Sequence, residues 1–322
     1  YGYRTLLSIL QSCNFRLYII KNEMSLKIKD HSISNRIKVV QIQETELDKL
    51  IFPFNKHSIQ SLEYKPFSRF SLAKSVDDVF SGELSKTLKN TLKDRNTGTA
   101  IIEPDIKNSK FDKDFLVKLS TALVYLVGLP NFDSMTGKYY ARFYVKHSDA
   151  SDSYLRKAYR NLDLHTDGTF VKEKTDWLLM TKMEEINVKG GESTLLHLDD
   201  WEHCEELSND PVGKANFTWG SPKSKNIEYK VEHPVFTKDR NGKPVISYID
   251  QFPEPKNMKQ GLFLQKLSDA LEQSKNKLTF PLKVGSAIFS NNYFWLHGRN
   301  AFKKDVNLSR ELLRIRGTFS DS

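Results

Sequence analysis

Leu164-His165-Thr166-Asp167-Gly168-Thr169 is the stretch from which the fold can be predicted. Side chains at positions i and i+2 of an extended strand point to the same face, so His165 and Asp167 could bind one metal ion together. A second histidine, His297, lies far downstream in Phe294-Trp295-Leu296-His297-Gly298-Arg299. Two histidines and one carboxylate form the ligand set that leaves three positions open on a non-haem Fe(II) ion.

Composition sets wide bounds on the function. The chain has 322 residues, 39% of them hydrophobic, which is enough to bury a large core. It has 49 basic and 40 acidic residues, so its net charge is +9. Because no run of five or six like charges occurs, we interpret this charge as a solvated surface that attracts small anions. A basic nucleic-acid-binding module is the alternative of another class, but we expect neither a nucleic acid nor a membrane as partner.

The cysteines and the N-terminus bear on the compartment. Cys13 and Cys204 have no pairing pattern or metal-ligand spacing, which favours a reducing compartment, and we expect a cytoplasmic protein. No stretch approaches 18 uninterrupted apolar residues, so no membrane span is predicted. Residues 1–23 contain two short apolar clusters without a cleavage site, and Met24 opens a polar stretch. We therefore expect residues 1–23 to be a foreign or disordered leader.

The hydrophobic pattern changes its period along the chain. Apolar spacing predicts helices over residues 75–93 and 111–126, while 24–60 indicates one or two peripheral strands and 100–102 a short buried strand. Further strands are predicted over 139–145, 177–183, 193–198, 230–236, 245–249, 284–290 and 312–319, with one helix over 258–274. This is a mostly β fold with flanking helices, either a sandwich or a jelly roll. We predict a single domain over 24–322, in which a helical part, 24–130, packs on a β core, 131–322.

A His-x-Asp pair alone arises easily by chance. Two further features strengthen its interpretation as part of a metal site. Ser193 follows the turn Gly190-Gly191-Glu192, and its hydroxyl could bind a carboxylate, although a hairpin with a polar tip would look the same. Arg310, Arg314 and Arg316 lie 13, 17 and 19 residues after His297, so on one strand they would share a face. Arginine binds carboxylates through two parallel donors, although a solvent-facing strand is the alternative. His297 itself comes just after the predicted strand over 284–290 and would suit a metal ligand at a strand end, although it could also be a satisfied core histidine.

In this order the residues resemble the Fe(II)/2-oxoglutarate-dependent dioxygenases of the taurine-dioxygenase and clavaminate-synthase type. The resemblance implies a double-stranded β-helix, or jelly-roll, core. It also implies that His165, Asp167 and His297 bind iron, that Ser193 contacts 2-oxoglutarate, and that an arginine of the last strand binds its distal carboxylate.

More specific segments, from about residue 60 to the C-terminus, resemble the glutarate 2-hydroxylase family, the carbon-starvation-induced proteins of bacterial lysine catabolism. They are Leu62–Lys65, Asn131–Asp133, Tyr139–Phe143, Ser151–Arg156, Leu196–His203, His233–Phe236, Tyr248–Phe252 and Phe294–Arg299. The family resemblance implies hydroxylation of glutarate to 2-hydroxyglutarate, with O2 and 2-oxoglutarate consumed and succinate and CO2 released. It also implies a homotetramer. Thr166 departs from the family's Asn, but it is expected to point away from the metal.

Two dicarboxylates in one cavity require separate cationic anchors. We expect Arg314 and Arg316 to bind 2-oxoglutarate, because they lie deeper in the last strand and next to Gly317. Arg310, and also Arg142 and Tyr140, are candidates for the substrate. The alternative within the class is the same chemistry on another small carboxylate, a sulfonate or an amino acid. His197 and His203 flank Asp199-Asp200 and are interpreted as part of a helix cap, not as a second metal site.

Overall fold

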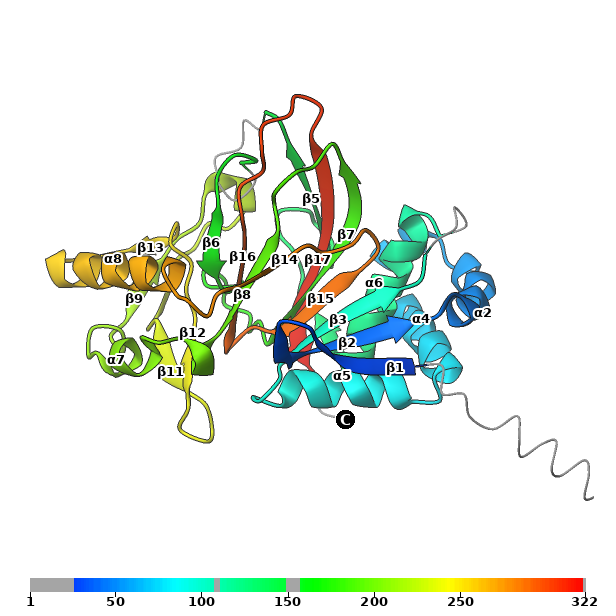
Figure 1. The fold of residues 1–322 in the computed structure, drawn as a ribbon, viewed down its shortest axis with the longest axis horizontal. Helices are drawn as coiled ribbons and strands as arrows, with labels where there is room; N and C mark the ends of the chain where they lie inside the picture. The colour runs from blue at the N-terminus through cyan, green and yellow to red at the C-terminus, as the bar shows by residue number, and fades with distance from the viewer. Residues whose placement is uncertain (1–25, 107–110, 149–156, 321–322) are drawn as a thin grey trace, which may run out of the picture.

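The computed structural model describes residues 26–106, 111–148 and 157–320, and its core is two β-sheets that face each other (Figure 1). The expected leader, residues 1–23, and the segment Ser151–Arg156 lie outside the described residues. The described part confirms the predicted jelly-roll type of fold, with helices flanking the sheets, although the sheets do not close into a barrel.

The larger sheet has eight strands and is built from both ends of the sequence. Its order is β1 (Leu26–His31), β2 (Ser34–Ile42), β3 (Thr99–Pro104), β15 (Ala287–Asn291), β7 (Trp177–Ile186), β17 (Ser309–Phe319) and β4 (Gly128–Pro130), and β5 (Ala141–Lys146) also pairs with β17. Strands β2 and β3 are parallel and the other pairs are antiparallel. Because the N-terminal strands continue the same sheet, we propose that residues 24–322 form one domain.

The smaller sheet has four antiparallel strands and carries the motif residues. Its order is β14 (Leu278–Phe280), β8 (Ser193–His197), β16 (Trp295–Arg299) and β6 (Leu162–His165). Apolar side chains of the two sheets, such as Ile288 and Leu195, belong to one buried cluster. The inner faces of the sheets thus enclose the space in which a site can form.

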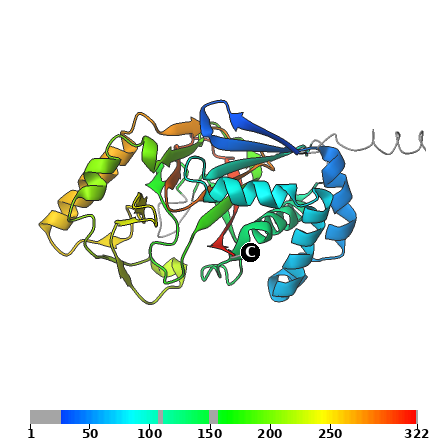
Figure 2. The same ribbon diagram turned by 90° about the horizontal axis from the view of Figure 1, so that it is seen from below.

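Five helices lie on the outer side of the larger sheet, the last two of them against its strands and the first three against the other helices (Figures 1 and 2). They are α2 (Glu44–Asn55), α3 (Ile59–Tyr64), α4 (Pro66–Val79), α5 (Glu83–Lys93) and α6 (Lys113–Val127). Helix α6 begins where the Asp112 carboxylate accepts a hydrogen bond from the Phe115 N–H at 2.8 Å, a standard N-cap. Its apolar side chains pack against the sheet residues Leu313 and Ile315 in one core cluster.

Strand β17 separates two charged environments. Arg310, Leu312 and Arg314 line the cavity between the sheets. Glu311 points to the helical side, where it is fully buried and accepts hydrogen bonds from Arg142 and, at 2.8 Å, from Lys113. The alternation predicted for this strand is therefore present.

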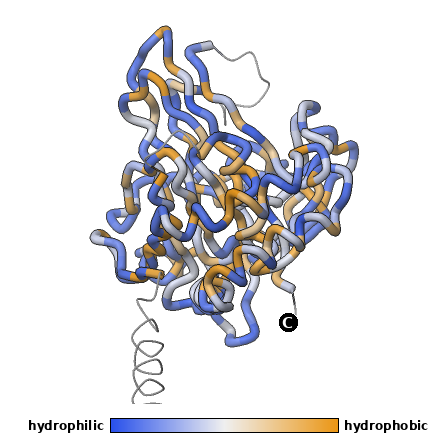
Figure 3. Tube along the Cα trace, turned by 90° about the vertical axis from the view of Figure 1, so that its right-hand side faces the viewer, coloured by the Kyte–Doolittle hydropathy of each residue, from blue (hydrophilic) through white to orange (hydrophobic). Residues whose placement is uncertain are grey.

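A long insertion between β8 and β14 covers the smaller sheet and lies at the left of Figure 1. It contains η2 (Leu198–Asp200), α7 (Cys204–Asn209), β9 (Phe217–Trp219), η3 (Lys223–Lys225), β10 (Val231–His233), β11 (Phe236–Lys238), β12 (Pro244–Ile246), β13 (Pro253–Glu254) and α8 (Met258–Glu272). Figure 3 shows that apolar segments concentrate in the interior and that peripheral loops are mostly hydrophilic. No helix of the described residues is long and apolar enough to cross a membrane.

Most predicted elements are confirmed, with four differences. The predicted helix over 75–93 is two helices, because Ser81 and Gly82 adopt left-handed backbone angles (φ 51° and 81°) that end α4. The region 24–60 contains helix α2 as well as strands, and the predicted strand over 230–236 is divided between β10 and β11. His297 does not follow a strand end but lies in the middle of β16.

Candidate metal centre and its cavity

The pairing of β6 with β16 brings the two motif histidines together. His165 and His297 are direct cross-strand partners, and their ring centroids are 4.2 Å apart. Asp167 follows two residues after the end of β6, and one ligand atom from each of the three side chains lies within 4.8 Å of the others. Gly298 allows this close packing, since a Cβ there would lie 2.4 Å from the Leu162 carbonyl oxygen on β6.

Hydrogen bonds orient the first histidine. The Nδ1 atom of His165 lies 2.8 Å from the carbonyl oxygen of Asp163, which can only accept, so Nδ1 carries the proton. Its Nε2 lies 4.0 Å from Asp167 Oδ1. Between them, the Thr166 hydroxyl accepts a hydrogen bond from the Tyr248 N–H at 2.9 Å, so Thr166 faces away from the three candidate ligands.

The backbone of Asp167 is fixed from two sides. Its N–H donates to Asn292 Oδ1 and its carbonyl accepts from Asn292 Nδ2, both at 2.9 Å. The next residue, Gly168, has φ +82°, and a Cβ there would lie 2.3 Å from Thr175 Oγ1. The turn after the carboxylate therefore requires glycine, and it directs Asp167 back toward the histidines.

The protonation states suit a divalent metal. Burial, followed by the proximity of His165, lowers the pKa of His297 to about 3, so this imidazole is neutral. Burial alone would raise the pKa of Asp167, but Arg314 and the two imidazoles outweigh it and hold the pKa well below its usual range. An ionised carboxylate and neutral imidazoles are the metal-binding forms.

Two buried atoms of this set lack hydrogen-bond partners among the described residues: His297 Nδ1 and Asp167 Oδ2. Arg314 Nη1 lies 3.1 Å from that oxygen, yet Oδ2 accepts no hydrogen bond in acceptable geometry. Buried polar atoms without partners are rare and call for an explanation. A metal ion bound by the three side chains would supply one, so the residues fit Fe(II).

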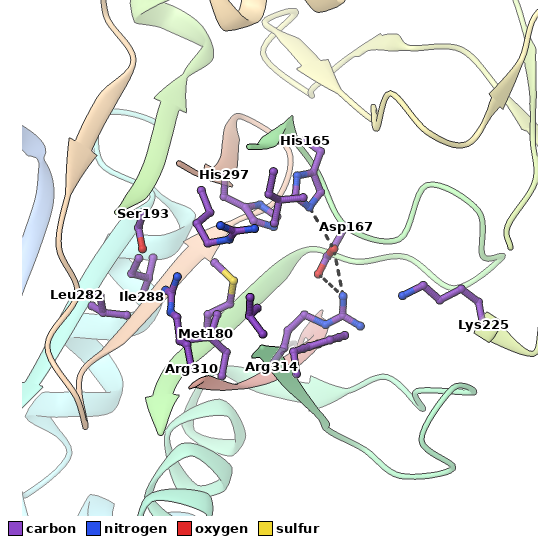
Figure 4. A pocket seen from close by; sticks show the side chains of 16 residues that line it. His165, Asp167, Met180, Ser193, Lys225, Leu282, Ile288, His297, Arg310 and Arg314 are labelled. Atoms are coloured by element: carbon purple, nitrogen blue, oxygen red, sulfur yellow. Dashed lines mark hydrogen bonds and ion pairs between the residues drawn. The ribbon is translucent and has the colours of Figure 1, made fainter. Parts of the chain in front are cut away.

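The three candidate ligands face a cavity between the sheets (Figure 4). Its apolar walls are formed by Phe143, Val145, Leu162, Met180, Leu282, Ile288 and Leu312. Its other polar lining residues are Ser193, Lys225, Arg299, Arg310 and Arg314. An apolar chamber with a few converging cationic groups suits small anionic ligands that have to be oriented.

One end of the cavity contains Arg310 and Ser193. Arg310 Nη1 donates to the carbonyl oxygen of Gly191 at 2.9 Å, two residues before Ser193. Its Nε has no hydrogen-bond partner among the described groups, and burial lowers its pKa to about 10. A buried guanidinium beside a hydroxyl forms a binding site for a carboxylate.

The other end contains Arg314, which bridges two carboxylates. Its Nη2 donates to Asp133 Oδ2 at 2.8 Å and its Nη1 to Asp167 Oδ1 at 3.3 Å, while the guanidinium lies over the Phe143 ring. These carboxylates raise the pKa of Arg314 against the effect of burial. Arg316 is buried nearby, and burial and then Arg314 lower its pKa.

Arg299 also lines the cavity, but its donors are engaged elsewhere. They are directed at the backbone carbonyl oxygens of Lys157, Ala158, Arg160 and Asn300 at 2.7–3.5 Å. Arg299 therefore fastens the loop before β6 to the smaller sheet.

Two sequence candidates are not brought to the cavity. Arg142 donates to Glu311 and Tyr140 to Glu63, both away from the candidate ligands. Because side chains alternate along β5, its cavity-facing residues are Phe143 and Val145.

The proposed cap at His197 is present, since its Nδ1 accepts from the Asp199 N–H at 3.0 Å. His203 precedes α7 without making a side-chain cap. Among residues 26–106, 111–148 and 157–320, the set His165, Asp167 and His297 is the one group of three or more such side chains close enough to share a metal ion.

Four residues at the site were not predicted as functional: Asp133, Lys225, Asn292 and Arg299. Asp133 and Arg299 do lie in segments that carry the family resemblance, which is the signal that could have identified them. Asn292 and Lys225 reach the site through tertiary packing, and no local pattern marks them.

Comparison with known proteins agrees with this geometry. The family model CsiD matches residues 26–319. Glutarate 2-hydroxylase of Klebsiella pneumoniae (strain 342) is 49% identical over 264 residues, covering 82% of this chain and 81% of that protein. The enzyme of the same name from Citrobacter koseri is 47% identical over 264 residues, with the same coverage.

Solved structures share the fold at low sequence identity. The non-heme iron oxygenase OrfP in complex with Fe and alpha-ketoglutaric acid has a TM-score of 0.68 at 15% identity, covering 87% of this chain and 94% of that one. Asparagine oxygenase in complex with Fe(II), 3-hydroxyasparagine and succinate has a TM-score of 0.67 at 13% identity, covering 87% and 93%.

Proposed function

The chain belongs to the CsiD family, and we propose that it is an Fe(II)- and 2-oxoglutarate-dependent dioxygenase that hydroxylates glutarate to 2-hydroxyglutarate. The observation that carries the proposal is 49% identity to a glutarate 2-hydroxylase along most of the chain. A buried set of two histidines and one carboxylate, facing a cavity with a cationic group at each end, supports it.

His165, Asp167 and His297 would hold the iron. With 2-oxoglutarate as cosubstrate, such a centre activates O2, releases succinate and CO2, and delivers one oxygen atom to the substrate. The protein's part is to orient both acids and to exclude water. The apolar walls serve the second purpose, because few groups on them would stabilise water inside the cavity.

We propose that Arg310 and Ser193 bind the distal carboxylate of 2-oxoglutarate. The hydrogen bond that Arg310 makes is to a backbone carbonyl and not to a carboxylate, and its Nε has no partner among the described residues. A buried guanidinium in this state favours the binding of an anion. This assignment differs from the sequence-based expectation, which gave 2-oxoglutarate to Arg314 and Arg316 and reserved Arg310 for the substrate.

Arg314, with Arg316 behind it, would then bind the substrate carboxylate next to the carbon that is hydroxylated. Arg314 contacts the candidate ligand Asp167 directly, so an acid bound to it lies beside the metal. That position suits oxidation at the carbon adjacent to a carboxylate.

A succinate-release assay tests the function. The purified protein is supplied with Fe(II), 2-oxoglutarate and O2 and is challenged with glutarate, other dicarboxylates, taurine and amino acids. We expect glutarate to stimulate succinate release and 2-hydroxyglutarate to appear in equal amount. If only another acid stimulated succinate release, glutarate would be ruled out as the substrate but the reaction class would stand. If no acid stimulated it, both the substrate and the reaction class would be ruled out.

We further propose a cytoplasmic enzyme of lysine degradation that assembles as a homotetramer. Cys204 is a buried free thiol, which is consistent with a reducing compartment. The exposed aromatic residues Phe52, Tyr64, Phe67 and Phe70, which are 52–77% exposed on helices α2–α4, are candidates for a subunit contact. Light scattering on the purified protein measures the assembly, and a monomer at micromolar concentration would contradict it.

A further inference from the structure

Met180 lies in the wall of the cavity, and the role that we infer for it rests on the proposed function. It belongs to β7 and lines the cavity that the three candidate metal ligands face. Among the described residues of that lining, it is the one that contains sulfur. The proposed iron site and acid sites give its thioether no role.

The alternation along β7 turns Met180 into the cavity. Its two neighbours point to the helical side: Leu179 is fully buried in the core under the helices, and the Thr181 hydroxyl lies 2.8 Å from that of Ser120 on α6. Successive side chains of a strand point to opposite faces, so Met180 has the other orientation. It is half-buried whereas both neighbours are buried, because its side chain borders open space.

The sheet register places Met180 beside the candidate metal centre. Its partner on β17 is Arg314, whose Nη1 lies 3.1 Å from Asp167 Oδ2. Its partner on β15 is Ile288, another residue of the cavity wall. Figure 4 shows the Met180 sulfur directed toward the side of the cavity on which Asp167 and His297 lie. The thioether therefore faces the space in which the metal would activate O2.

Of the apolar groups around the cavity, the thioether is the easiest to oxidise. The other wall residues are aliphatic or, in Phe143, aromatic, and their oxidation requires breaking a C–H bond or attacking a ring. A thioether sulfur accepts an oxygen atom through a lone pair, and methionine sulfoxide is the product. When glutarate is bound, its methylene chain is the target of oxidation. When the cavity contains 2-oxoglutarate without substrate, Met180 is the oxidisable group that faces the metal.

We propose that Met180 accepts the oxygen atom when 2-oxoglutarate is turned over without substrate, and that the resulting sulfoxide inactivates the enzyme. In this reaction the C1–C2 bond of 2-oxoglutarate breaks and CO2 leaves. One atom of O2 enters the new carboxylate of succinate, and the other forms the S–O bond of the sulfoxide. The thioether and 2-oxoglutarate lose two electrons each, O2 gains four, and no net proton is released.

The sulfoxide changes the acid site next to it. Its oxygen is a polar hydrogen-bond acceptor that stands where an apolar sulfur was. The cross-strand partner Arg314 is the proposed anchor of the substrate carboxylate. An S–O group beside this guanidinium competes with glutarate for its donors, so oxidation lowers the affinity for the substrate. Bound substrate, in turn, protects Met180 from oxidation.

The test is peptide mass spectrometry of the protein after incubation with Fe(II), 2-oxoglutarate and O2, with catalase present to remove peroxide. Trypsin releases Met180 in Thr175–Lys182 and Met183 in the next peptide, Met183–Lys189, so the two methionines are measured separately. Met183 is 3% exposed in the core under the helices, whereas Met258 on α8 is 80% exposed. Met258 therefore reports oxidation from solution, and Met183 reports oxidation that follows unfolding.

We expect one oxygen atom on Met180 and none on Met183 or Met258. Glutarate should suppress this oxidation, and omission of 2-oxoglutarate should abolish it. Hydrogen peroxide added to the metal-free protein without catalase should give another order, with Met258 oxidised first. Activity measured afterwards with glutarate should fall in step with the fraction of Met180 that is oxidised.

The variant Met180→Leu keeps the volume of the side chain and removes the sulfur, an exchange that cores usually tolerate. Met183→Leu is the matched control, because Met183 lies on the same strand but on its helical side. After incubation without glutarate, each protein is compared with its own starting activity. Met180→Leu should retain most of that activity, while Met183→Leu should lose it as the wild type does.

If the wild-type protein releases succinate with glutarate but Met180 is never oxidised, Met180 is not the acceptor and the proposed function stands. Oxidation of Met258 before Met180 in the full reaction would also contradict the proposal, as would equal oxidation of Met180 with and without glutarate. These results come from the wild-type protein and do not depend on whether a variant folds. If no succinate is released under any condition, the proposed function is wrong, and the role of Met180 falls with it.

Discussion

Replacing Arg310 by methionine should weaken the binding of 2-oxoglutarate and leave the binding of glutarate unchanged. Arg310 is 2% exposed and, among the described residues, makes one hydrogen bond, to the Gly191 carbonyl oxygen. Burial disfavours its charge, so an apolar side chain of similar length is expected to be tolerated by the fold. What is lost is a charged hydrogen bond to 2-oxoglutarate, about 1.5–3 kcal/mol, or roughly a 10- to 100-fold rise in the KM for 2-oxoglutarate.

The assay is succinate release at saturating glutarate with 2-oxoglutarate varied, and then the reverse. Arg314→Met should show the opposite pattern, with the larger rise in the KM for glutarate. Arg142→Met is the control on the same sheet. It should leave both KM values unchanged and lower the unfolding temperature, because Glu311 is fully buried and loses one partner. If Arg310→Met spared 2-oxoglutarate while Arg314→Met did not, the two acids would be exchanged and the reasoning refuted.

Three further changes test the centre and its surroundings. His165→Ala and His297→Ala should each abolish Fe(II) binding and turnover while circular dichroism stays unchanged; retained tight Fe(II) binding would contradict the assigned ligands. Asn292→Ala frees both backbone bonds that fix the carboxylate loop and should weaken Fe(II) binding roughly 10- to 100-fold in a metal titration, whereas wild-type affinity would show that the clamp is dispensable. Burial, and then Arg36, lowers the pKa of His197 from 6.5 to about 4. The unfolded chain thus binds a proton that the folded one does not, and stability should fall by up to about 3 kcal/mol as pH drops from 6.5 to 4. When the free energy of unfolding is measured in urea between pH 6.5 and 4, it should change less with pH in His197→Gln than in the wild type. The same change with pH in both proteins would refute the role of His197.

Where a local pattern marks the residues, the sequence predicted which of them come together at the candidate site. His165 and Asp167 do come together, but Asp167 lies two residues beyond the end of β6 and not on the same strand as His165. The alternation of Arg310 and Arg314 is a property of a single strand and is present in β17. Pattern reasoning works there because a strand has one repeat and the buried face is marked by apolar neighbours.

What was not predictable depends on which strands become neighbours. His297 was expected at a strand end because nothing local shows that it pairs with His165. Arg142 was assigned to the wrong face of β5, since both faces of that strand carry aromatic and polar residues and alternation alone does not say which face is inward. The break of the predicted helix at Ser81 was missed for another reason: the apolar spacing continues from α4 into α5 although the backbone does not.

Strand β17 has a consequence for how the protein acquires activity. It is hydrogen-bonded to β7 on one side and to β4 and β5 on the other. Without residues 309–319, β4 and β5 would therefore not be joined to the rest of the larger sheet. A slip by one residue would turn Arg310 toward the helices and Glu311 into the cavity, leaving two buried charges without partners. The buried charges that alternate along this strand therefore also favour a single register. A chain that ends before residue 309 would lack Arg310 and Arg314, so we expect it to lose both proposed acid sites even though His165, Asp167 and His297 are present.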